Sequence, residues 1–247
     1  MKRFGWQIRL GLILLASSAL IYSIHYAIFR DAHHIFFYLI GDIAFIPIEV
    51  LIVSLIIHRM LEVREKRMRL EKLNMVIGVF FSEMGTNLLT YFSDCDPKLD
   101  DIRKDLIVTN NWSEEEFVRV NKHLRNYDYG VDIKKVDWAS LRSFLIKERD
   151  FVLRLLENPY LLEHEAFTDL LHAVLHLSEE LSARKDIHDL PGADLKHIGG
   201  DLRRAYVLLV HQWLEYMKHL KENFPYLFSL AMRTNPFDEN ASPLVTS

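Results

Sequence analysis

Two long apolar runs near the start of the chain constrain its fold more than any other feature. Residues 10–29 contain no Lys, Arg, Asp or Glu, and residues 35–57 contain two acidic side chains. A helix needs about 20 residues to cross the hydrocarbon core of a bilayer, so each run is long enough. The first run is longer than the roughly 7–15 residues of a signal-peptide core, which favours a retained anchor. The pattern predicts a transmembrane hairpin over residues 1–58, embedded in a lipid bilayer.

The basic residues around the two runs predict the orientation of this hairpin. Three of them precede the first run and a cluster follows the second, whereas the short loop pairs one basic with one acidic residue. Cytoplasmic segments next to membrane helices carry an excess of Lys and Arg, so we expect both termini in the cytoplasm and the protein in the inner (plasma) membrane. The cluster would also lie near anionic lipid headgroups. Its members are Arg59, Arg64, Lys66, Arg67 and Arg69.

Four polar residues inside the apolar runs fall on defined helix faces. Ser18 and His25 are seven residues apart, and so are Asp42 and Glu49. A spacing of seven places two side chains on one face of a helix. If the chain turns near residue 32 or 33, His25 lies level with Asp42, and Ser18 with Glu49, so we expect each pair to meet. Such contacts either hold the hairpin and a homo-oligomer together or line an ion or proton path.

The rest of the chain predicts an all-α cytoplasmic domain. Residues 1–72 contain ten Lys and Arg against six Asp and Glu, a net charge of +4, and residues 73–247 contain twenty against twenty-eight, a net charge of −8. The acidic balance argues against a nucleic-acid partner, and a single cysteine excludes a disulfide framework. We expect a basic juxtamembrane linker helix over residues 59–97, continuous with the second membrane helix. A helical domain over residues 98–235 and a mobile tail over residues 236–247 would follow.

Turn and capping residues divide this domain into helices with short connections. Ser113 and Glu116 form a capping box, Asp137 is a second N-cap, and Asn158-Pro159 and Pro191-Gly192 mark breaks between helices. Short connections favour an antiparallel bundle. The expected helices cover residues 98–108, 113–127, 137–157, 165–184, 193–222 and 226–232.

One arrangement of histidines in the domain has metal-ligand spacing. His172 and His176 are four residues apart, and Glu179 or Glu180 follows on the same side of the helix, a set of side chains that zinc or iron could use. The apolar face of this helix lies opposite, however. The pattern therefore favours solvated histidines, and we predict no bound metal or other cofactor.

A second polar stripe lies on the helix expected at residues 193–222. It includes His197, Asp201 and Arg204, and an apolar stripe occupies the opposite side of that helix. A solvated face accounts for it. A metal site could still form if the two polar stripes met each other or a neighbouring subunit.

The sequence contains no Walker A loop, GxGxxG, GxSxG, HExxH or kinase motif set. We therefore expect a two-pass, oligomeric membrane protein that is not an enzyme, with an interaction or regulatory domain that binds a protein partner. One alternative is an oligomer that conducts ions or protons past Asp42, Glu49 and His25. A weaker alternative is a membrane-tethered metalloprotein.

The C-terminal stretch Phe224–Phe237, FPYLFSLAMRTNPF, is unusually apolar for a chain end. We expect it to dock on the bundle or on another subunit. Together with the second membrane helix and the linker helix that contains Leu70–Leu88, it resembles an uncharacterised family of prokaryotic two-span membrane proteins. The resemblance implies a hairpin followed by a helical domain, and it implies no activity.

Overall fold

A computed structural model describes residues 2–187 and 189–245 of the chain. Every regular element in these residues is a helix and none is a strand, so the all-α prediction is confirmed. The chain divides into two units, one ending at Lys66 and one beginning at Arg67, and each is described by itself. The boundary falls inside helix α2 (Ala32–Phe80), which contributes residues to both units.

The first unit is a hairpin of helix α1 (Lys2–Phe29) and the first part of α2. Only Arg30 and Asp31 connect the two helices, and Arg30 takes a φ of 49°, which side-chain-bearing residues rarely adopt. The Asp31 carboxylate accepts a hydrogen bond from the backbone N–H of His34 (3.1 Å) and so caps the start of α2. Both helices are long and apolar enough to cross a membrane.

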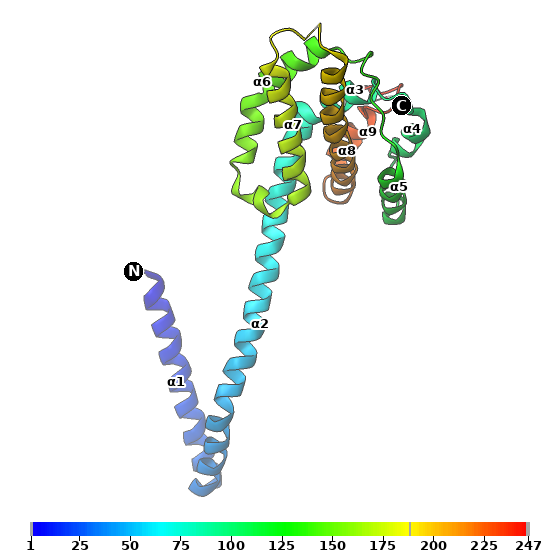
Figure 1. The fold of residues 1–247 in the computed structure, drawn as a ribbon. Coiled ribbons are helices and arrows are strands. Elements are labelled where there is room, and N and C mark those ends of the chain that lie inside the picture. The colour runs from blue at the N-terminus through cyan, green and yellow to red at the C-terminus, as the bar shows by residue number, and fades with distance from the viewer. Residues whose placement is uncertain (1, 188, 246–247) are drawn as a thin grey trace. The chain divides into compact units, whose positions relative to one another are not determined.

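The second unit begins with the end of α2. Along the chain it contains three long helices, with short helices before and after them (Figure 1). Helix α2 runs through Pro47 without ending, and the chain stays helical to Ser93, which confirms the predicted continuity. The remaining elements are η1 (Phe81–Gly85), α3 (Thr86–Ser93), α4 (Asp100–Leu106), α5 (Glu114–Asn126), α6 (Trp138–Leu156), η2 (Pro159–Glu163), α7 (Glu165–Ala183), α8 (Gly192–Asn223) and α9 (Pro225–Arg233).

The element η1 is a single π-helical turn between α2 and α3. Phe80 packs edge-on against Phe167 at 5.3 Å between ring centroids, and Phe81 stacks on Tyr216 at 4.9 Å. A Cβ atom added to Gly85 would lie 2.7 Å from both phenylalanine rings. Glycine is therefore required where the widened turn brings these rings close to the backbone.

Helix α8 provides the centre of the core. It packs against α7, and α7 packs against α6, in the order that short antiparallel connections predict (Figure 1). The expected apolar stripes of α7 and α8 are confirmed, since every member is buried. The buried members are Phe167, Leu170, Leu171, Val174, Ser178 and Leu181 on α7, and Leu202, Tyr206, Leu209, Trp213 and Leu220 on α8.

The C-terminal stretch docks on its own domain. Phe228 is buried, and the Phe237 ring lies 5.0 Å from the ring of Trp213 with 1% of its surface exposed. The buried Asn235 side chain donates a hydrogen bond to the carbonyl of Leu106 (2.8 Å). The prediction of a mobile tail from residue 236 is therefore wrong at Phe237, because this ring belongs to the core.

Candidate functional site

The polar residues of the hairpin are the first candidate site. Because the turn lies at Arg30–Asp31 and not at residues 32–33, His25 stacks on His34 at 6.1 Å between ring centroids. His34 precedes Asp42 by eight residues, or about 12 Å of helix rise. The predicted meeting of His25 with Asp42 is therefore wrong, and the same shift of the turn places Ser18 out of register with Glu49.

Asp42 and Glu49 instead project from α2 as exposed side chains. Within the part of the chain that the structure describes, neither carboxylate has a hydrogen bond or an ion pair. The predicted basic cluster at the following turns is likewise exposed, and Arg67 pairs with Glu71 one helical turn later (3.1 Å). In this part of α2, the acidic, basic and apolar side chains are therefore all exposed.

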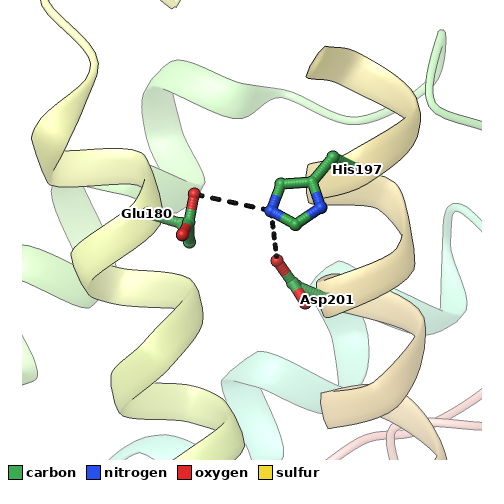
Figure 2. Close-up of side chains that lie close together, drawn as sticks. All are labelled: Glu180, His197 and Asp201. Atoms are coloured by element: carbon green, nitrogen blue, oxygen red, sulfur yellow. Dashed lines mark ion pairs between the residues drawn. The ribbon is translucent and has the colours of Figure 1, made fainter. Parts of the chain in front are cut away.

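The second candidate site lies between α7 and α8, where the two polar stripes of the sequence meet. His197 of α8 directs its Nε2 atom toward carboxylates from both helices (Figure 2). That atom lies 3.8 Å from Oε2 of Glu180 and 3.5 Å from Oδ2 of Asp201. His176 of α7 adds its own Nε2 atom, 3.5 Å from the same Asp201 oxygen and 4.0 Å from Oε1 of Glu180. We call these four residues the α7–α8 cluster.

Asp201 is the buried member of the α7–α8 cluster. Its side chain is 4% exposed, and its Oδ2 atom has no hydrogen-bond donor among the residues that the structure describes. Its other oxygen, Oδ1, lies 3.2 Å from Nη1 of Arg204. On nearly the opposite face of α8, Gly199 packs so closely on Ile133 that a Cβ atom would lie 2.7 Å from that side chain.

Arg184 at the end of α7 fixes the position of Glu180. Its guanidinium donates to Oε2 of Glu180 (2.7 Å) and makes two bonds to the carboxylate of Asp194 (2.6 and 2.7 Å). These hydrogen bonds hold the pKa of both carboxyl groups below its usual range. Glu180 is thus ionised at neutral pH, with Oε1 directed toward His176.

The sequence identified only part of this cluster. His176 and Glu180 lie in it, whereas His172 is exposed one turn earlier and Glu179 pairs with Arg149 (3.5 Å). His197 and Asp201 come from the other stripe. No local signal in the sequence distinguishes these two residues from the other polar residues of that stripe.

Cys95 offers no reactive group. Burial, with a smaller contribution from Asp94, raises the pKa of its thiol to about 11. The thiol also donates to the carbonyl of Tyr91 (3.3 Å).

Comparison with known proteins identifies matches over both parts of the chain. Residues 2–61 match the family described as "MJ1433, N-terminal helical domain", and residues 69–233 match "Uncharacterized protein MJ1433, C-terminal helical domain". A relative from Methanocaldococcus jannaschii, "Uncharacterized protein MJ1433", is 47% identical over 240 residues, which cover 97% of this chain and 96% of the relative. No solved structure matches the chain. The chain therefore belongs to the MJ1433 family, an uncharacterised family as the resemblance implied.

Proposed function

We propose that this chain is a two-pass membrane protein whose hairpin anchors a cytoplasmic helical domain with an interaction or regulatory role. The observation that carries the proposal is the exposure of the hairpin. In both candidate spans, the most apolar stretch has none of its residues buried within the structure. An apolar surface of this extent needs a cover, and the acyl chains of a bilayer provide one along helices of this length.

The distribution of charge supports the orientation in this proposal. The loop at Arg30–Asp31 has no net charge, while the exposed cluster from Arg59 to Arg69 follows the second span. Basic residues next to a span favour the cytoplasmic side, so both termini and the helical domain would lie there. The domain binds a partner in this proposal and performs no catalysis.

Cysteine labelling tests the orientation in whole cells. In a Cys95→Ser background, His33→Cys should react with a membrane-impermeant maleimide from outside, and Ala241→Cys should react only after the cells are permeabilised. Both positions are exposed, so accessibility in the protein does not limit the reaction. The reverse labelling would contradict the orientation, and recovery of the protein in the soluble fraction would contradict the anchor.

The unpaired carboxylates support an oligomer and motivate a second candidate function. Asp42 and Glu49 sit on one face of α2, and ionisable groups inside a bilayer are costly unless protein or water faces them. A second copy of the hairpin would supply that environment, either as a packing contact or as a lined path for ions or protons. His25 near the loop could extend such a path.

One measurement tests the oligomer, and a second separates a packing role of the carboxylates from a conducting role. Light scattering or mass photometry of the detergent-purified chain should show more than one copy, and a monomer would contradict both. For conduction, flux through liposomes should fall in Asp42→Asn and in Glu49→Gln. A flux that the two substitutions leave unchanged, or no flux at all, would leave the carboxylates with a packing role.

A further inference from the structure

We propose that Glu180, His197 and Asp201 bind one divalent transition-metal ion of the zinc type, with His176 as the fourth ligand. This goes beyond the anchoring function above and departs from the sequence-based expectation that no metal binds. It rests on three features of the α7–α8 cluster, namely the identity of the donor atoms, their spacing, and the unsatisfied oxygen of Asp201.

The donor set fits an ion of this class. Two imidazoles and two carboxylates make a mixed nitrogen and oxygen site, which zinc and similar divalent ions accept, whereas magnesium and calcium prefer oxygen ligands alone. One donor atom from each of Glu180, His197 and Asp201 lies within 4.8 Å of the others. Two of these residues come from α8 and one from α7, so the ion would join two helices.

The spacing of the donors fits a shared ion better than a direct bond. The His197 Nε2 atom is 3.5 Å from Asp201 Oδ2 and 3.8 Å from Glu180 Oε2, too far for hydrogen bonds between them. Ligand atoms about 2.0–2.1 Å from a tetrahedral zinc ion are about 3.4 Å from each other. The two separations drawn in Figure 2 are therefore close to two edges of a coordination tetrahedron.

Asp201 supplies the independent observation that a ligand belongs here. Buried carboxylate oxygens without a hydrogen-bond donor are rare. Such an atom loses its hydrogen bonds to water on folding and gains none from the protein, which costs free energy. Oδ2 of Asp201 is such an atom, and it is directed at the imidazole nitrogens of His176 and His197. A cation at this position would satisfy the oxygen that the protein leaves unpaired.

The surroundings support the site without filling it. Arg184 binds Oε2 of Glu180 and Arg204 lies beside Oδ1 of Asp201, which fixes both carboxylates and leaves Asp201 Oδ2 without a donor. His197 is half exposed, and a shallow pocket lined by Gly200, Asp201 and Arg204 opens beside it. An ion can therefore enter from solvent and clip the end of α7 to the start of α8.

A zinc titration of the full chain in detergent tests this proposal. After treatment with a chelator and dialysis, calorimetry should show one equivalent of Zn²⁺ bound. His197→Gln should weaken the affinity at least tenfold, since a half-exposed residue can be replaced without disturbing the core. Asp201→Asn should do the same, with its thermal unfolding measured in parallel because the residue is buried.

The matched control is His172→Gln, an exposed histidine on α7 one turn before His176, which should leave the affinity unchanged. Absence of stoichiometric binding by the unmodified chain would overturn the proposal. Equal affinity in His197→Gln and His172→Gln would also overturn it, because the zinc would then be bound by surface histidines elsewhere. Cobalt(II) bound to the unmodified chain should give the visible spectrum of a tetrahedral site, and a spectrum of six-coordinate cobalt would contradict the coordination proposed here.

Discussion

The two parts of helix α2 contain similar apolar side chains in opposite environments. In the hairpin, Phe45 is 53% exposed and Ile56 is 55% exposed, whereas Leu73 and Phe80 near the other end are 3% and 0% exposed. One helix thus packs within its own domain at one end and has uncovered apolar side chains at the other. Apolar content alone does not show which environment a helix occupies, but the pattern of buried partners does.

The largest expected effect separates the two ends of α2 with the same substitution. Phe80→Ala should reduce the free energy of unfolding of the domain by about 3–5 kcal/mol, because it removes a fully buried ring that packs on Phe81 and Phe167. Phe45→Ala should leave that free energy unchanged. Chemical denaturation of the full chain in detergent, followed by tryptophan fluorescence, measures both. Equal losses would contradict the contrast between the ends of the helix.

A charge on the exposed apolar surface should distinguish the hairpin from the domain. Leu51→Arg places a cation on the side of α2 opposite Glu49, where insertion into a bilayer would cost about 2.5–3.5 kcal/mol. Val118→Arg is the control, because Val118 is similarly exposed on α5 of the domain. The membrane-integrated fraction should fall only for Leu51→Arg. An unchanged fraction would mean that lipid does not cover this surface.

Arg184→Gln tests how far the domain relies on the ion pairs that join the end of α7 to the start of α8. The substitution should cost about 1–3 kcal/mol, since it leaves Glu180 and Asp194 without their shared donor. Arg119→Gln, which breaks more exposed pairs with Glu116 and Asp105, should cost about 0–1 kcal/mol. Thermal or chemical unfolding compares the two variants.

The contribution of Arg184 to the stability of the domain should also decrease as the pH falls. Its hydrogen bonds lower the folded-state pKa of Glu180 and Asp194, so their contribution to stability is complete above the unfolded-state pKa of about 4 and declines as the pH falls toward the folded-state values. The stability difference between Arg184→Gln and the unmodified chain should therefore shrink between pH 7 and pH 3. A constant difference would show that Arg184 does not stabilise the domain through the ionised forms of these two carboxyl groups.

The smallest effect concerns the capping of a helix end inside the domain. Ser113 accepts a hydrogen bond from the N–H of Glu116 at the start of α5, so Ser113→Ala should cost about 1 kcal/mol. Ser143→Ala, at an exposed position inside α6, should be neutral or slightly stabilising. A similar loss for both serines would show that capping does not explain the effect.

Local signals made the helices predictable to within about two residues at most ends. Ser113 and Asp137 are N-caps as expected, and α8 ends one residue after its predicted end at Glu222, where Pro225 prevents its continuation. These signals act over three or four residues and can be read from the sequence directly. The hairpin register could not be read in this way, because Arg30 adopts a backbone conformation that no local pattern demanded.

The sequence left open whether the two polar stripes of the α7–α8 cluster meet, and it did so for a different reason. Each polar stripe is a solvated face when its helix is considered alone, and only the packing of α7 on α8 brings His197 between Glu180 and Asp201. His197 follows Glu180 by 17 positions, and the path of the chain between α7 and α8 decides whether their side chains meet. Such long-range contacts leave no periodic signal in a single sequence.

The π-helical turn at Phe81–Gly85 limits the number of residues that this part of the helix can contain. A π turn is equivalent to one residue inserted into an α-helix. The widened turn absorbs that residue, but a second inserted residue would rotate everything that follows by about 100°. Leu88, Leu89 and Phe92 are all fully buried and would leave the core together. Related sequences should therefore accept substitutions in this segment far more readily than further insertions.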